Sequence, residues 1–222
     1  MAPDAPTGAR PRYARDDSEF DRAIGFIDAT FALALTLLIT TLEVDDSASA
    51  WDSLGSLDEA LGAQFVAFAI AFVVIAGYWL RHHRMVASFT AIDYPVIVLN
   101  LGLVAAIVLL PFSTQAVGDP GISELALPTA LMAVNVAAAS ILHGSVYRLA
   151  RHRGLLSPQP STAEANQFLL ASLSTAAVFL VSIPIAYILC PDWARTSWLL
   201  LIPLGYVLDR RSKRRGGERW QA

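Results

Sequence analysis

Asp28 is the only charged side chain between Phe26 and Leu42, in a stretch that otherwise holds apolar residues and threonines. These seventeen residues are about the minimum for a helix that crosses a hydrocarbon core of roughly 30 Å. An ionisable group in or beside such a core is costly, and it usually has a function and a partner on another helix. We therefore expect Asp28 to accept hydrogen bonds from a neighbouring helix inside the protein.

The helix that contains Asp28, which we predict over Arg22–Val44, has two different faces. At about 100° per residue, one face covers roughly 100° and carries a stripe of leucines and threonines, Leu33, Thr36, Leu37 and Thr40. Asp28 points about 140° away from Leu33, and Arg22 about 120° away from Asp28, so these two charges should not pair. The stripe suits the lining of an aqueous path. The alternative is that the threonine hydroxyls only bond to carbonyls of their own helix.

The remaining polar groups do not form a recognisable catalytic or metal site. The sequence has no Gly-rich phosphate loop, no HExxH, no GxSxG and no TVGYG carbonyl filter. His82 and His83 are adjacent, so on a helix they diverge by about 100° and no second pair completes a metal site. The single cysteine, Cys190, excludes an intramolecular disulfide. We predict no enzyme activity, no metal and no cofactor, and a hydrogen-bonding role for at least one histidine.

The composition predicts an all-α, polytopic membrane protein. Apolar residues make up 55% of the 222, the mean hydropathy is +0.51, and apolar runs of spanning length recur. We predict six transmembrane helices, at about residues 22–44, 57–80, 92–115, 125–147, 165–189 and 193–208. They form one domain over residues 18–208, with a flexible segment before it (1–17) and a basic tail after it (209–222).

Six spans place both termini on one side of the membrane, and the charges indicate which side. With a cytoplasmic N-terminus, fifteen of the sixteen Lys and Arg residues are inside and Arg195 is outside. The opposite orientation breaks the positive-inside rule at every loop. We therefore predict cytoplasmic N- and C-termini, with the basic tail as an orientation signal and anionic-lipid contact as a further option. Since no folded domain presents the basic cluster, we predict no nucleic-acid binding.

Four short motifs occur in the order of a known family. They are Arg22-x-x-x-Phe26-Ile27-Asp28, Tyr78-Trp79-x-x-His82-His83, Asn100, and Pro111-Phe112-Ser113-Thr114. Together they resemble the transmembrane protein 175 family of endosomal, lysosomal and prokaryotic potassium channels. The resemblance covers roughly residues 18–115 and continues only as hydropathy beyond them. Ile27 departs from the family serine, and Thr40 stands where the family often has a bulky aliphatic residue.

The resemblance implies a pore lined by the first helix of each subunit, with a hydrophobic constriction in place of a carbonyl filter. The constriction maps to Leu33, the ion-selecting threonine to Thr36, and the next layers outward to Leu37 or Thr40. A ring of leucines can gate by dewetting, and Glu43 would attract cations at the outer mouth. The family's polar gating network maps to Arg22, Phe26, Asp28, Trp79, His82 and Asn100.

One first helix cannot enclose a pore, and the 222 residues contain no internal duplication. Because the two-repeat members of the family resemble dimers, a one-repeat chain is expected to be a homotetramer around a fourfold axis. The resemblance thus implies a potassium-permeable cation channel, multi-pass in the lipid bilayer of a prokaryotic plasma membrane. Two alternatives stay open: a non-conducting membrane scaffold, and a secondary transporter or proton leak pathway, for which only Pro184 suggests a broken helix.

Overall fold

The computed structural model describes residues 12–43, 51–201 and 203–205. Within these residues, helices account for nearly all of the regular structure, and two three-residue strands form a small antiparallel sheet. The elements are β1 (Arg12–Ala14), α1 (Ser18–Leu37), η1 (Leu38–Thr41), α2 (Leu54–Ala87), β2 (Ala91–Asp93), α3 (Tyr94–Val108), α4 (Leu110–Gly118), α5 (Ala126–His152), α6 (Thr162–Ile188), α7 (Pro191–Ser197) and η3 (Trp198–Leu200).

Local polar signals start three of the long helices. Ser53 accepts a backbone N–H at the start of α2, and Asp93 does the same at the start of α3. Ser161 and Glu164 form a reciprocal capping box at the start of α6. Each cap satisfies backbone N–H groups that have no partner within the first helical turn.

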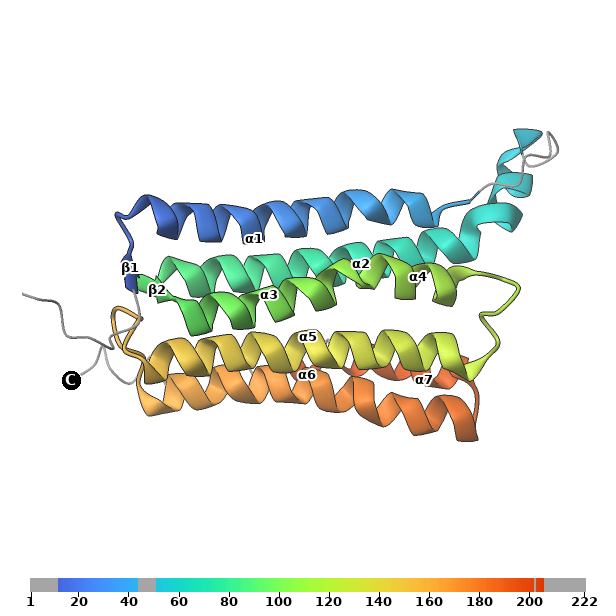
Figure 1. Cartoon of the computed structure of the whole chain (residues 1–222). Helices are drawn as coiled ribbons and strands as arrows, with labels where there is room; N and C mark the ends of the chain where they lie inside the picture. Colours follow the sequence, from blue (N-terminus) through green and yellow to red (C-terminus); the bar gives the residue numbers. More distant parts are fainter. Residues whose placement is uncertain (1–11, 44–50, 202, 206–222) are drawn as a thin grey trace, which may run out of the picture.

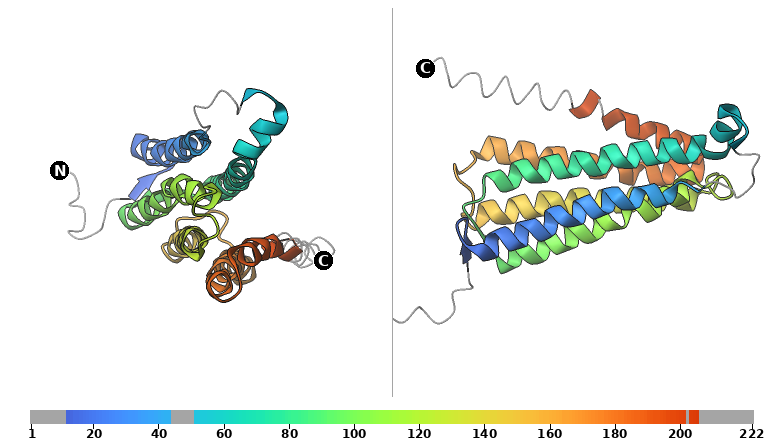
Figure 2. Two further views of the ribbon diagram at one scale, coloured as in Figure 1. Left: turned by 90° about the vertical axis from the view of Figure 1, so that its right-hand side faces the viewer. Right: turned by 90° about the horizontal axis from the view of Figure 1, so that it is seen from above.

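The helices lie side by side in a bundle, with α1 along one edge (Figure 1). The pair α2 and α3–α4 forms the middle of the bundle, and α5, α6 and α7 cover the side opposite α1. The end-on view in Figure 2 shows α1 at the periphery, beside α2 and α3. One long face of α1 is therefore not covered by the other described helices of the same chain.

α1 and η1 attach to the bundle through one face. Ile27, Phe31, Ala34 and Leu38 are almost fully buried, and they recur every three or four residues, which is the spacing of one helix face. They join the larger hydrophobic core, together with residues from α2 to α6. Burial of this face fixes the rotation of α1, so the opposite face must point away from the core.

Short contacts tie together the end of the bundle where α1 and α3 begin. β1 pairs with β2 in the register Arg12 with Asp93, and the buried Asp93 also forms an ion pair with the partly exposed Arg153 at the end of α5. Arg12 donates to the Arg153 carbonyl at 3.2 Å. Residues 12–17 belong to the N-terminal segment over 1–17 that we predict to be flexible, and β2 offers backbone partners to residues 12–14 of it. Residues 1–11 lie outside the described part.

Five helical segments in the described part of the chain are long and apolar enough to cross a membrane. They are Ser18–Thr41, Leu54–Ala87, Tyr94–Gly118, Ala126–His152 and Thr162–Ile188, and they correspond to the first five predicted spans. We predict a sixth span over residues 193–208, and its described residues include the short C-terminal helices α7 and η3. The end of this span and the basic tail over 209–222 lie outside the described residues.

Proline affects two spans differently. The predicted third span consists of two consecutive helices, α3 and α4, with Leu109 between them. Pro111 has no backbone N–H to donate to the preceding turn, which interrupts the hydrogen-bond ladder at this point. α6, in contrast, continues from Thr162 to Ile188 with Pro184 inside it, so the transporter-like broken helix that Pro184 suggested is absent from this described segment.

Candidate functional site

The predicted stripe lies on the uncovered face of α1 and η1. We call Leu33, Thr36, Leu37 and Thr40 the outer stripe. Leu33 is 55% exposed and Leu37 is 37% exposed, and both threonines are exposed as well. These exposed leucines and threonines lie on a helix face that no other described helix of the chain covers. Such a face marks a surface for contact with lipid, with further copies or with a pore. The rotation of α1 thus matches the faces expected from the sequence.

The threonine hydroxyls of this helix bond to its own backbone. Thr36 Oγ1 donates to the Ala32 carbonyl at 2.9 Å, and Thr40 Oγ1 donates to the Leu37 carbonyl at 2.7 Å. The hydroxyl protons of Thr36 and Thr40 therefore bond to carbonyls of their own helix, as in the alternative given above for these threonines. Each hydroxyl oxygen still has acceptor capacity, so the outer stripe presents oxygen atoms that can face a cation or water.

Asp28 points toward α2 and accepts a hydrogen bond there. Trp79 Nε1 donates to Asp28 Oδ1 at 3.1 Å, and Asp28 is half-buried. The Trp79 indole also stacks on the His83 ring, with 5.4 Å between the ring centroids. These contacts connect the carboxylate of α1 to an aromatic pair on α2, which is the arrangement expected for a charge placed at this depth.

Arg22 and Phe26 do not join this contact. Arg22 Nη1 pairs with Glu19 Oε1 at 3.0 Å, and both side chains are largely exposed. Arg22 thus points away from Asp28, as the helix geometry predicts. Phe26 is exposed as well, and together with Arg22 it borders a shallow hollow of about 510 Å³ that Tyr94 of α3 also lines. Two of the six predicted network residues therefore lie on the outer surface at the start of α1.

His82 and Asn100 are buried in the core and are not hydrogen-bonded to Asp28. The His82 ring lies 5.7 Å from the Phe31 ring, and neither of its nitrogens has a hydrogen-bond partner among the described residues. Asn100 Nδ2 donates to the Val96 carbonyl of its own helix at 2.9 Å, while its Oδ1 lacks a partner in the same part of the chain. The predicted network is thus divided into an Asp28–Trp79 contact and separate buried polar groups.

α5 adds polar groups that the sequence motifs do not include. The His143 ring lies 6.1 Å from the His82 ring, and Tyr78 Oη donates to the Val136 carbonyl at 3.0 Å while also bonding to Ser140. His143 is the only histidine in the predicted span over residues 125–147, and this is the signal in the sequence that could have indicated it. Its contact with His82 joins α5 to α2 through two residues that are more than fifty positions apart in the sequence.

Glu43 lies at the opposite end of α1, where the chain leaves η1. Its backbone N–H donates to Gln64 Oε1 at 2.7 Å, and Gln64 Nε2 donates to its carbonyl at 3.1 Å. Gln115 Nε2 donates to Glu43 Oε1 at 2.7 Å. α2 and α4 therefore hold an exposed carboxylate near the end of the outer stripe. No group of three or more His, Cys, Asp or Glu residues that could bind a metal occurs among the described residues.

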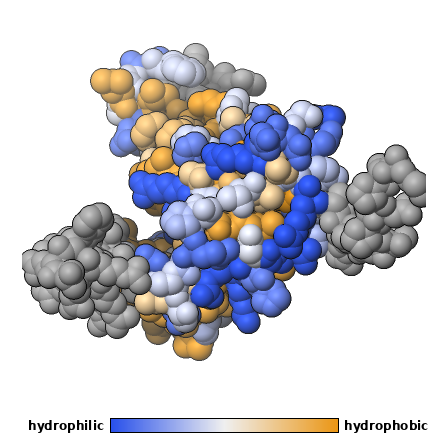
Figure 3. All heavy atoms as spheres, turned by 90° about the vertical axis from the view of Figure 1, so that its left-hand side faces the viewer, coloured by the Kyte–Doolittle hydropathy of each residue, from blue (hydrophilic) through white to orange (hydrophobic). Residues whose placement is uncertain are grey.

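The two ends of the bundle differ in their number of arginines. Of the nine arginines in the described residues, eight belong to the end where α1 begins and α2 and α5 finish, and Arg195 belongs to the other end. Arg195 pairs there with Asp192 at 3.2 Å and donates to Thr129 at 3.1 Å. Figure 3 looks onto the arginine-rich end and shows that hydrophilic residues dominate it.

Residues 22–111 match the sequence profile of the family described as the endosomal/lysosomal potassium channel TMEM175. Among curated proteins, a potassium channel of Streptomyces collinus is 31% identical over 105 residues, which are 46% of this chain and 49% of that protein. A potassium channel of a Chryseobacterium species is 26% identical over 97 residues, covering 44% of this chain and 48% of the relative. The chain thus spans about half the length of the curated relatives it matches.

The fold is also similar to two crystal structures. A lysosomal potassium-selective channel TMEM175 homologue from Chamaesiphon minutus superposes with a TM-score of 0.69 at 20% identity, covering 86% of this chain and 99% of that one. A variant of the potassium channel MtTMEM175 superposes with a TM-score of 0.62 at 17% identity, covering 96% and 99%. At these identities the likeness concerns the fold, and it extends well beyond residues 22–111.

Proposed function

We propose that the chain belongs to the TMEM175 family, whose sequence profile matches residues 22–111, and that it forms a potassium-permeable cation channel. The observation that carries this proposal is the outer stripe of α1. It faces away from the buried core of its own chain and combines leucine side chains with threonine oxygens. The family is one of channels and not of enzymes, and the curated relatives that match the chain are described as potassium channels.

The pathway in this proposal forms between copies of the chain. A single α1 cannot surround an ion, whereas four copies around a common axis place four outer stripes opposite one another. Leu33 then forms the narrow ring, where apolar walls make hydrated ions unfavourable and control conduction by dewetting. Thr36 forms the next ring and offers hydroxyl oxygens, and Leu37 and Thr40 form the rings toward the outer mouth.

The two ends of the bundle have different roles in this proposal. The arginine-rich end faces the cytoplasm, following the positive-inside rule, and both termini are on that side if residues 193–208 complete a sixth span. Glu43 then lies at the outer mouth, where four carboxylates would concentrate cations. The protein is a multi-pass component of the plasma membrane of a prokaryote.

Asp28 and Trp79 set the position of α1 in this proposal. Their hydrogen bond links the pore helix to α2 on the face opposite the outer stripe, so a change in the bond would shift the rings that line the pore. Ile27 occupies the place of the family serine and is buried, so it contributes packing and no hydroxyl to this contact. His82 and Asn100 belong to the buried support behind α1.

The proposal is tested by potassium and sodium flux from liposomes that contain the purified protein. Leu33→Ala should raise the flux because it widens the constriction, and Thr36→Val should lower the preference for potassium because it removes a ring of oxygens. Leu173→Ala on α6 is the matched control, because Leu173 is an exposed leucine far from α1. Absence of flux from the folded oligomer in every variant would contradict the proposal and would favour a non-conducting scaffold.

A further inference from the structure

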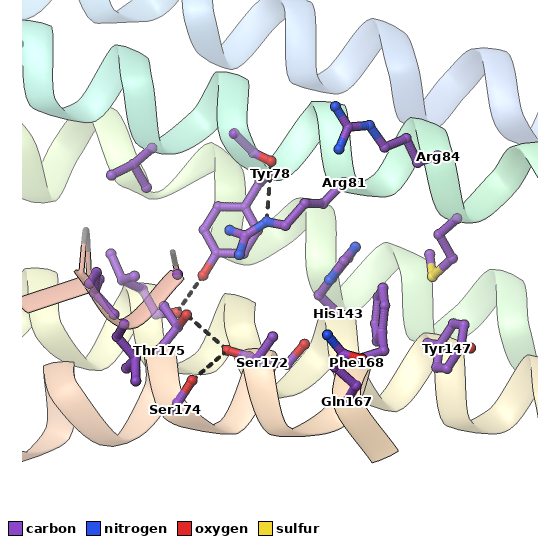
Figure 4. Close-up of a pocket in the computed structure, with 18 of the residues that line it drawn as sticks. Tyr78, Arg81, Arg84, His143, Tyr147, Gln167, Phe168, Ser172, Ser174 and Thr175 are labelled. Carbon is purple, nitrogen blue, oxygen red and sulfur yellow. Dashed lines mark hydrogen bonds between the residues drawn. The ribbon is translucent and has the colours of Figure 1, made fainter. Parts of the chain in front are cut away.

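A second feature of the chain lies on the side of the bundle away from α1. α2, α5, α6 and the short C-terminal helical stretch enclose a cavity of about 820 Å³, open toward the surface (Figure 4). We call this cavity the arginine groove, after Arg81 and Arg84, which line it from α2. It shares no residue with the outer stripe and is not used by the proposed ion pathway.

The walls of the arginine groove are apolar along most of its length. Val73 and Val74 of α2, Phe168 and Phe179 of α6 and Leu201 contribute hydrocarbon surface. The hydroxyls of Ser174 and Thr175, which also line it, donate to the Ala171 carbonyl at 3.0 and 3.1 Å. Their donors are therefore already satisfied within α6, and this part of the groove suits a hydrocarbon chain better than a polar ligand.

Both arginines lie at the end of the groove nearest the end of α2. Arg81 Nε donates to the Gly77 carbonyl at 3.2 Å, and its guanidinium carbon lies 4.7 Å from the centre of the Tyr78 ring. These contacts fix the guanidinium while its two Nη groups have no hydrogen-bond partner among the described residues. Arg84 belongs to the last turn of α2, and neither arginine forms an ion pair within the described part of the chain.

The acidic residue that lines the groove is already engaged elsewhere. The Glu164 carboxylate accepts hydrogen bonds at 2.7 Å from both the backbone N–H and the hydroxyl of Ser161, in the capping box of α6. The described lining therefore holds two arginines and one carboxylate, and that carboxylate belongs to a helix cap. Among the described residues, the charged side chains that line the groove have a net positive charge.

The depth of the groove matches one leaflet of a bilayer. From Val73 to Arg84, α2 rises about 16 Å, which is roughly half of the 30 Å hydrocarbon core. Arg84 lies three residues before the end of α2 at Ala87, and we expect the end of a spanning helix to lie at the level of the lipid headgroups. Arginines at this level bind phosphate groups readily, and basic pockets between membrane helices are known sites for anionic headgroups.

We propose that the arginine groove binds an anionic glycerophospholipid, with its phosphate on Arg81 and Arg84 and one acyl chain along the apolar wall toward Val73. The charge of the two arginines selects the anionic headgroup, and the length of the wall accepts a chain from the same leaflet. This inference does not depend on ion conduction, so the flux experiment and the lipid-binding experiment test two separate proposals, and either can be refuted without the other.

Lipid binding is measured by native mass spectrometry of the full chain in detergent, titrated with dioleoyl-phosphatidylglycerol and, in parallel, with dioleoyl-phosphatidylcholine. The wild-type protein should retain the anionic lipid preferentially. Combining Arg81→Gln with Arg84→Gln should weaken phosphatidylglycerol binding roughly thirtyfold at low salt. Arg148→Gln is the matched control, because Arg148 is an exposed arginine at the same end of the bundle that does not line the groove.

A second variant tests the acyl-chain part of the site without changing charge. A Cβ added at Gly77 meets no atom within 4 Å, so Gly77→Leu can fold while its side chain fills the groove. It should weaken phosphatidylglycerol binding, and an unchanged melting temperature in lipid-free detergent would show that the fold is intact. Equal binding of both lipids, equal loss in Arg148→Gln, or full binding by Gly77→Leu would each overturn the proposal. The proposal would also be overturned if a neighbouring subunit filled the groove and the oligomer retained no lipid there.

Discussion

Trp79→Phe removes the side-chain hydrogen bond that joins α1 to α2 among the described residues. The bond links Trp79 Nε1 to Asp28 Oδ1 over 3.1 Å. Phenylalanine keeps most of the ring area that stacks on His83 but has no N–H to donate. The half-buried carboxylate then loses its donor from α2, while α1 keeps its buried apolar face.

The expected cost follows from the environment of the pair. A hydrogen bond to a charged group contributes about 1.5–3 kcal/mol when buried, and partial exposure of Asp28 places the expected value at about 1–2 kcal/mol. Trp79→Phe also loses some packing, so its total effect on the free energy of unfolding exceeds the hydrogen-bond contribution. The two effects must be separated by experiment.

A double-mutant cycle separates them. The free energy of unfolding is measured by denaturation in mixed micelles at a fixed protein concentration, for wild type, Trp79→Phe, Asp28→Ala and the double variant. Trp79→Phe loses the same packing in the wild-type protein and in Asp28→Ala. The difference between its effects in these two proteins, the coupling energy, therefore reports the hydrogen bond alone. A coupling of about 1–2 kcal/mol is expected. Coupling below about 0.3 kcal/mol, the usual error of additivity, would refute the reasoning.

Three further variants test the packing that supports the site. Tyr78→Phe should lower the free energy of unfolding by about 1–2 kcal/mol, because the Tyr78 hydroxyl joins α2 to Val136 and Ser140 of α5; a thermal melt equal to that of the wild type would contradict this. Gly144→Val should cost about 1–3 kcal/mol, since a Cβ there lies 3.1 Å from the Ser172 Cβ; Gly25→Ala, where a Cβ meets nothing, is the control for the melt. Asp93→Ala should lower the free energy of unfolding by about 3 kcal/mol or more, because it removes the α3 cap and leaves Arg153 without its buried partner. Asp93→Asn keeps the cap, so its melting temperature should lie between those of wild type and Asp93→Ala.

The sequence predicted the rotation of α1 because helical periodicity carries that information directly. At about 100° per residue, Ile27, Phe31 and Ala34 point roughly 100° to 160° away from Leu33, and the structure buries these three residues and exposes Leu33. Asp28 was expected to face a neighbour for the same reason. The family pattern placed Trp79 and His82 in one network with Asp28 without naming the donor, and the structure shows that Trp79 donates.

Features that arise from contacts between distant helices were not predictable in this way. Three-residue strands such as β1 have no periodic signal, so the sheet that orders residues 12–14 was missed. His143 lies beside His82 because α5 packs against the core, and the motifs end before α5 begins. The arginine groove likewise depends on the spacing between α2 and α6, which no local pattern encodes. The ion pair between Arg22 and Glu19 on the surface likewise has no counterpart in the motifs.

The most direct test of the central claim asks whether the outer stripe lines the conducting path. Cys190 is the only cysteine, so Cys190→Ala gives a background in which Thr36→Cys and, as control, Leu173→Cys carry a single thiol. Potassium flux from liposomes is recorded before and after addition of a membrane-impermeant, positively charged thiol reagent. A channel lined by α1 predicts that the reagent blocks flux through Thr36→Cys and leaves Leu173→Cys unchanged. Undiminished flux through fully modified Thr36→Cys would contradict the account.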